Sequence, residues 1–152
     1  MEATDLSGVA ERQVLRETVV FRGHPMVRAL HPTTIEVTTE EDLTARGDCI
    51  IGVAADKGCE QLGEAARAAI RTAGARVRIK ILVGGLQFVV KARGDPGLQL
   101  SDRHEMVVRR SSFLSERTLA VHADFAARDI PRPMIRMLTH PETVGRLEIE
   151  VG

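Results

Sequence analysis

The stretch that decides the fold is residues 76–93, RVRIKILVGGLQFVVKAR. Apolar and polar side chains alternate through 76–83 and again through 86–93, which is the period of a strand with one buried face. Gly84-Gly85 joins the two runs, and a two-glycine link between alternating runs is typical of a tight β-hairpin. The sequence therefore predicts an antiparallel hairpin near the middle of the chain.

Further strand-like and helical segments lie on both sides of this hairpin. Runs rich in β-branched residues predict strands at 14–23, 33–39, 49–55, 106–112, 118–123 and 146–151. Helical periodicity is strong at 59–73, and RPMIRMLTH at 132–140 fits a short helix. We find one strand–helix–strand unit, at 50–83, and no internal repeat. The prediction is an α+β fold, mainly antiparallel β: a sandwich or open barrel of about seven or eight strands with one or two helices.

Length and composition limit the class of protein. A chain of 152 residues is expected to form one domain, 1–152, with residues 1–13 as a loosely ordered lead-in. The 21 basic and 21 acidic residues cancel, and Trp and Tyr are absent, which disfavours nucleic-acid binding by overall charge or base stacking. A local basic patch and a homo-oligomer stay open. With no secretory signal, no paired-cysteine zinc motif and no apolar run of about 20 residues, we expect a cytoplasmic protein without membrane contact.

Several long motifs from Phe21 to the C-terminus carry a family resemblance. They are GHP at 23–25, TTIE at 33–36, RGDCIIGV at 46–53 and RRSSF at 109–113. Together they resemble an archaeal family catalogued as domain of unknown function 371. The resemblance implies a compact, sandwich-like β-rich domain and an archaeal cytoplasmic source. It implies no established activity, so it assigns no catalytic residue.

The first candidate site combines His24, His31, Glu36 and Asp48. Imidazoles and carboxylates suit a divalent metal of the zinc or manganese type, with His24, His31 and Asp48 as ligands. In that interpretation Glu36 and Asp48 are catalytic, and Glu36 takes the proton of a metal-bound water. The spacing matches no known ligand signature. The alternative is that both histidines bond local backbone at turns, Asp48 caps a turn and Glu36 is solvated.

The second candidate site lies at RRSS, residues 109–112, followed by Arg117. Guanidinium groups bind phosphates and carboxylates through two parallel hydrogen bonds, which suits an anionic ligand. Strand alternation puts Arg109 and Ser111 on one face, so the candidate ligand-binding residues are Arg109, Ser111 and Arg117. The alternative is internal ion pairing with nearby acidic residues. These are Asp102, Glu105 and Glu116.

Cys49 is a weaker candidate for a nucleophile. It follows Asp48, and a histidine occurs in the same segment. A neighbouring carboxylate raises a thiol pKa, however, and free cysteines are among the most often buried residues. We therefore favour a buried, unreactive thiol.

These observations rank three functions. A small anionic-ligand-binding or regulatory domain, for a phosphate- or carboxylate-bearing ligand, comes first. A metal-assisted hydrolase that uses the first candidate site comes second, and a nucleic-acid-associated protein comes third. Whether the chain is an enzyme stays open.

Overall fold

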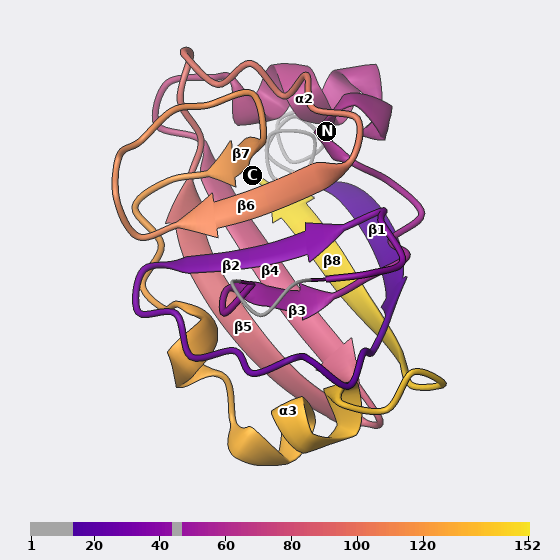
Figure 1. The fold of residues 1–152 in the computed structure, drawn as a ribbon. Coiled ribbons are helices and arrows are strands. Elements are labelled where there is room, and N and C mark those ends of the chain that lie inside the picture. The colour runs from indigo at the N-terminus through magenta and orange to yellow at the C-terminus, as the bar shows by residue number, and fades with distance from the viewer. Residues whose placement is uncertain (1–13, 44–46) are drawn as a thin grey trace, which may run out of the picture.

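The computed structural model describes residues 14–43 and 47–152, which form two four-stranded sheets packed on a shared core (Figure 1). Our expectation for residues 1–13 lies outside the described residues.

Sheet A has the order β1-β8-β4-β5, and these strands span Leu15–Arg22, Val144–Val151, Arg76–Val83 and Leu86–Arg93 respectively. Sheet B has the order β3-β2-β6-β7, from Ile50–Gly52, Thr34–Thr38, Glu105–Arg109 and Thr118–Ala120. Neighbouring strands are antiparallel except β2–β3 and β6–β7. The predicted α+β, mainly antiparallel sandwich is confirmed.

Two short helices close the opposite ends of the sandwich (Figure 1). Each consists of a 3-10 turn followed by an α-helix: η1 (Cys59–Gln61) with α2 (Glu64–Ile70), and η2 (Ala127–Asp129) with α3 (Arg132–Leu138). The continuous helix expected at 59–73 is therefore wrong. Leu62 and Gly63 are extended between η1 and α2, because Leu62 turns inward and is buried while the Gly63 N–H donates to Glu17. None of the described helices is long and apolar enough to cross a membrane.

The structure contains an internal repeat, so our expectation of none is wrong. The elements β1, β2, β3, η1, α2 and β4 correspond in order to β5, β6, β7, η2, α3 and β8. If each strand is replaced by its counterpart, the order β1-β8-β4-β5 becomes β5-β4-β8-β1, which is the same sheet listed from its other edge. The same holds for β3-β2-β6-β7. Unusual backbone angles repeat as well: φ is 51° at Ala29 and 50° at Leu100, and 52° at Ala54 and 54° at His122. A second strand–helix–strand unit, missed in the sequence, therefore follows β7.

The two halves hold each other at matching junctions. RGHP at 22–25 and RGDP at 93–96 are equivalent segments. The N–H of His24 donates to Leu138 of the second half, and the N–H of Asp95 donates to Ile70 of the first. In each junction the preceding glycine touches a helix end, and a Cβ on Gly23 or Gly94 would overlap backbone carbonyl oxygens. The helix of each half is therefore docked by the loop of the other.

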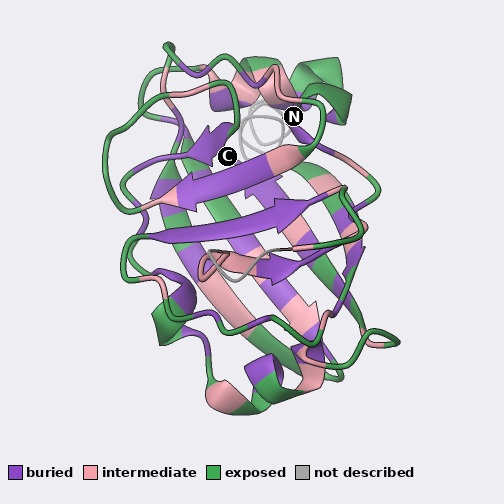
Figure 2. Ribbon diagram, in the orientation of Figure 1, coloured by how far each residue is buried: buried purple, intermediate pink, exposed green. Residues whose placement is uncertain are grey.

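Sheet B is buried on both faces at its two central strands. Figure 2 shows β2 and β6 coloured as buried along most of their length. Ile35 and Val37 enter the core, whereas Thr34, Glu36 and Thr38 point to the opposite face and are still buried. A buried polar face is uncommon, because each polar group on it needs a partner. It is therefore the first place to look for a functional site.

Candidate functional site

The two histidines before proline bind local backbone. His24 Nδ1 accepts a hydrogen bond from the N–H of Met26 at 3.0 Å, and His31 Nδ1 accepts from the N–H of Thr33 at 3.1 Å and Thr34 at 3.2 Å. In the second half of the repeat their places are taken by aspartates with the same contacts. Asp95 accepts from Gly97 at 2.8 Å, and Asp102 accepts from His104 and Glu105, each at 2.8 Å. Turn formation therefore accounts for one ring nitrogen of each histidine.

The side chains of the first candidate site have separate partners. His24 Nε2 lies 3.3 Å from Asp42, and the Asp48 carboxylate lies 3.9 Å from Arg28. The Asp48 main-chain carbonyl accepts from His31, but Glu36 points instead toward Cys49. Within residues 14–43 and 47–152, no three histidine, cysteine or acidic side chains are arranged to hold a metal ion. Metal binding by His24, His31 and Asp48 stays a prediction.

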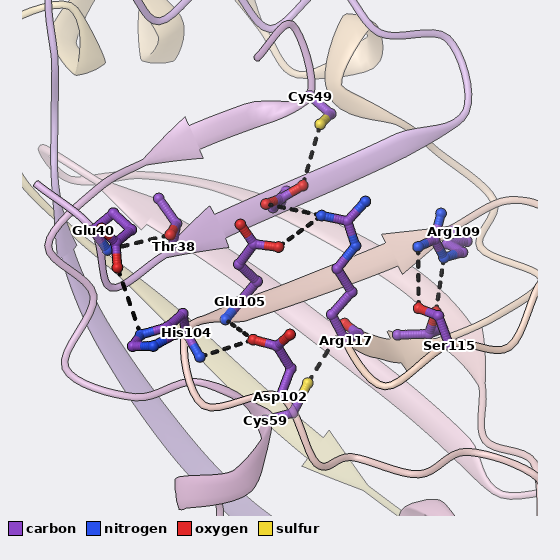
Figure 3. Close-up of polar contacts among 12 residues, drawn as sticks. Thr38, Glu40, Cys49, Cys59, Asp102, His104, Glu105, Arg109, Ser115 and Arg117 are labelled. Atoms are coloured by element: carbon purple, nitrogen blue, oxygen red, sulfur yellow. Dashed lines mark hydrogen bonds and ion pairs between the residues drawn. The ribbon is translucent and has the colours of Figure 1, made fainter. Parts of the chain in front are cut away.

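Glu36 joins one residue from each of the other two candidates, Cys49 and Arg117, in a group on the outer face of sheet B that also includes Glu105. We call these four residues the Glu36 cluster. Arg117 Nη1 donates to Glu105 Oε1 at 2.6 Å and lies 3.9 Å from Glu36 Oε2. Cys49 Sγ donates to Glu36 Oε1 at 3.4 Å. Figure 3 shows Arg117 and Glu105 reaching toward each other, and Cys49 pointing toward the same group from the opposite direction. Both Arg117 and Cys49 lie close to the Glu36 carboxylate.

Burial dominates the electrostatics of this cluster. Burial, followed by the negative charge of Glu105, raises the pKa of Glu36, and Arg117 opposes both, so that the pKa is about 7. Burial, followed by the charge of Glu36, raises the pKa of Cys49 to about 11. The Cys49 thiol therefore stays protonated at neutral pH, as expected for an unreactive cysteine.

The remaining residues of the second candidate site are also engaged inside the protein. Arg109 Nε donates to Thr118 Oγ1 at 2.8 Å, Nη2 donates to Ser115 Oγ at 3.3 Å, and the guanidinium lies 4.9 Å from the centre of the Phe113 ring. Ser111 Oγ accepts from the N–H of Phe113 at 3.3 Å. Arg117 is paired to Glu105, so each of these side chains has a partner inside the protein. Ligand binding by Arg109, Ser111 and Arg117 stays a prediction.

A different place in the molecule is open and basic. A cavity of about 820 Å³ lies beside the outer face of β4 and β5, and we call it the basic cavity. Its walls are Val14, Arg76, Val77, Arg78, Lys91, Ala92, Arg93, His122, Asp124, Glu150 and Gly152. Across the β4–β5 hairpin, Arg76 is directly opposite Arg93, and Arg78 is directly opposite Lys91. None of the ion pairs among the described residues involves these four cations.

The two carboxylates of the basic cavity already have other partners. Glu150 Oε2 accepts from Arg16 at 3.2 Å and lies 3.3 Å from Lys80. Asp124 Oδ1 accepts from the main-chain N–H of Lys91 at 2.9 Å. Asp124 and Glu150 offset part of the positive charge of the cavity, but the four cations outnumber these two carboxylates.

The comparisons with known proteins identify the family. The model of the family described as Domain of unknown function (DUF371) matches residues 19–152. The chain belongs to the DUF371 family. An uncharacterized protein of the archaeon Methanocaldococcus jannaschii is 36% identical over 117 residues, which cover 77% of this chain and 86% of that relative. The resemblance drawn from the sequence motifs is thereby confirmed.

The basic cavity of this DUF371 member was missed at the sequence level, although its signal was present. A hairpin centred on Gly84-Gly85 fixes the register of β4 and β5, and that register sets 76 opposite 93 and 78 opposite 91. All four positions carry Arg or Lys. The net charge of the whole chain does not reveal these cation pairs, because acidic residues elsewhere in the sequence bring the net charge to zero.

Proposed function

We propose that this DUF371 domain binds a small anionic, phosphate- or carboxylate-bearing ligand in the basic cavity. The observation that carries the proposal is that two pairs of cations, Arg76 with Arg93 and Arg78 with Lys91, lie opposite each other across neighbouring strands and line one cavity. Like charges directly opposite each other across a sheet destabilise it, by up to about 1 kcal/mol for each pair. An anion between them replaces this repulsion with attraction.

The internal repeat supplies a comparison within the same molecule. At the equivalent place, between β8 and β1, Val144 is opposite Arg22 and Arg146 is opposite Val20. Ala54 stands where the second half has His122. The backbone that forms the basic cavity is thus present twice, but paired cations occur on one copy. The fold itself does not require them, which supports a role in binding.

The size and chemistry of the cavity match a metabolite rather than a single ion. Small-molecule sites commonly occupy about 300–1,000 Å³. Two arginines on one strand, Arg76 and Arg78, offer forked donors, and Lys91 adds a point charge. His122 adds a ring nitrogen at the wall. A ligand with two or more anionic oxygens would contact both cation pairs at once.

Thermal stability in the presence of inorganic pyrophosphate or citrate tests the proposal. A ligand at a hundred times its dissociation constant adds about 2.7 kcal/mol to the free energy of unfolding. We expect this stabilisation in the wild type and its loss in Arg78→Ala and Lys91→Ala. The matched control is Arg146→Ala, which removes the equivalent arginine of the other half and should keep the effect. No stabilisation by either anion, or equal loss in the control, contradicts the proposal.

A short single-stranded oligonucleotide distinguishes a small ligand from a nucleic acid. Both present phosphate groups, but nucleic-acid binding weakens steeply as salt rises, because counterions are released. We expect weak oligonucleotide binding beside clear pyrophosphate binding. If the oligonucleotide binds through Arg78 and Lys91 and the small anions do not, the nucleic-acid alternative is correct and the small-ligand proposal is wrong.

A further inference from the structure

Glu36 occupies a position suited to an apolar side chain. It lies at the middle of β2, directly opposite Val107 of β6, and the repeat makes these two residues equivalent. Val107 is 1% exposed and Glu36 is 4% exposed. A carboxyl group in such a place loses the water that stabilises its charge, so its neutral form is favoured.

The groups facing Glu36 supply too little positive charge for two carboxylates. Glu105 comes from β6, Arg117 from the segment before β7, and the Cys49 thiol from the segment before β3. Arg117 is close to Glu105 at 2.6 Å but lies 3.9 Å from Glu36, beyond hydrogen-bonding distance. Arg109 attracts Glu36 electrostatically, but its Nε is bonded to the Thr118 hydroxyl. Glu36 is thus left with a thiol as its hydrogen-bond donor.

We propose that Glu36 and Glu105 form a proton-binding pair, which holds one shared proton near neutral pH while Arg117 compensates the single remaining negative charge. The proton resides on Glu36, whose carboxyl group donates to the Glu105 carboxylate. Arg117 donates to the Oε1 atom of the same carboxylate. Two like-charged carboxyl groups in contact commonly keep one proton between them. The inference does not rest on the basic cavity, because none of these residues lines it.

Because this proton is lost as the pH rises, the stability of the outer face of sheet B depends on pH. With Glu36 ionised, two carboxylates share one guanidinium in a buried site, and the face must loosen or admit water. Burial raises the pKa of Glu36 from 4.5 in the unfolded chain to about 7 in the folded protein. The folded state therefore holds the extra proton between these values, and stability falls as the pH rises through that window. Above it, the loss is complete.

Side-chain ¹³C NMR of the glutamate carboxyl carbons measures the proton directly, without any substitution. We expect one wild-type glutamate to titrate with a midpoint near 7. In Glu105→Gln this midpoint should move down toward 4.5, because the negative charge that raises it is gone. A wild type in which every glutamate titrates near 4.5 overturns the proposal, and so does a midpoint unaffected by Glu105→Gln.

Chemical denaturation between pH 5 and 8 tests the effect on folding. Wild-type stability should fall across this range, whereas Glu36→Gln, which mimics the neutral carboxyl, should show a flatter profile. Glu36→Val, which copies the equivalent Val107, is a second variant in case the first does not fold. Glu148→Gln, on sheet A and outside the cluster, should keep the wild-type slope. A wild-type slope retained in Glu36→Gln or Glu36→Val contradicts the proposal.

Discussion

At the scale of single residues, two buried glutamates show how neighbours decide the charge of a carboxyl group. Burial raises the pKa of both Glu36 and Glu150. For Glu150, hydrogen bonds from Lys80 and Arg16 outweigh burial, so its pKa lies below the usual value. Glu36 shares one arginine with a second carboxylate, and its pKa rises. The two carboxyl groups therefore respond to pH in opposite directions.

Replacing Glu150 by Gln should lower the stability at neutral pH. The variant loses hydrogen bonds to two cations, and bonds of this charged kind contribute about 1.5–3 kcal/mol. Because the folded pKa of Glu150 is lowered, its contribution is present above the unfolded value of 4.5 and is lost as the pH falls through the folded value. Urea unfolding should therefore show the wild type and Glu150→Gln converging in acid. A difference that stays constant into acid would contradict this assignment.

The residue types of the site could be predicted, but their partners could not. The sequence singled out Glu36, Cys49, Arg109 and Arg117 in three separate groups, and the structure places them on one sheet face. Their meeting depends on β2 lying beside β6 in sheet B, a long-range pairing that no local pattern reports. The histidines misled for a related reason. A histidine ring nitrogen can accept a hydrogen bond from a backbone N–H in a turn, as an aspartate oxygen does, or it can bind a metal ion. The presence of a histidine in the sequence does not distinguish these two roles.

At the scale of elements, the junction of each half depends on a glycine. Gly23 packs against the carbonyl oxygens of Leu138 and His140, and Gly94 packs against that of Ile70. The chain enters these contacts from the end of an edge strand and then turns at a proline. The close approach lets the loop amides bond the last carbonyls of the opposite helix, which would otherwise lack partners.

Gly23→Ala and Gly94→Ala should destabilise the protein by similar amounts. An added Cβ overlaps backbone atoms, which cannot rotate away, and overpacking of this kind costs typically 1–3 kcal/mol. The comparison variant is Gly74→Ala, whose Cβ meets nothing within 4 Å and which bears only the strain of its φ of 75°. Thermal unfolding of the three variants is the measurement. Wild-type stability in both junction variants would show that the halves do not need this contact.

Elements with a strong local pattern were predictable, and elements set by packing were not. The hairpin at Gly84-Gly85 is confirmed, and both glycines have positive φ, 55° and 82°. The helix at 59–73 failed because its periodicity continues through Leu62 and Gly63 while the backbone does not. Periodicity reports which face is buried, and η1 and α2 bury the same face although the chain between them is extended.

At the scale of the whole molecule, a repeated backbone carries unlike side chains. Equivalent pairs such as Glu36 with Val107, His31 with Asp102 and Ala54 with His122 share hydrogen bonds or backbone angles but not chemistry. This divergence explains why the repeat was not seen in the sequence, where the RG-x-P motif is the plainest trace. It also gives every proposal a control inside the same chain. The β4–β5 pair carries the paired cations, and the equivalent β8–β1 pair keeps the same scaffold without them.

The most direct test of the anion-binding proposal is a backbone amide NMR titration with inorganic pyrophosphate. We predict that the largest shifts fall on residues 76–78, 91–93 and 122–124, which form the walls of the basic cavity. The equivalent residues at the β8–β1 pair and after β3, which are 144–146, 20–22 and 54–56, should move little. Equal shifts at the two equivalent places, shifts centred on 109–117, or no shifts at all would contradict the proposal.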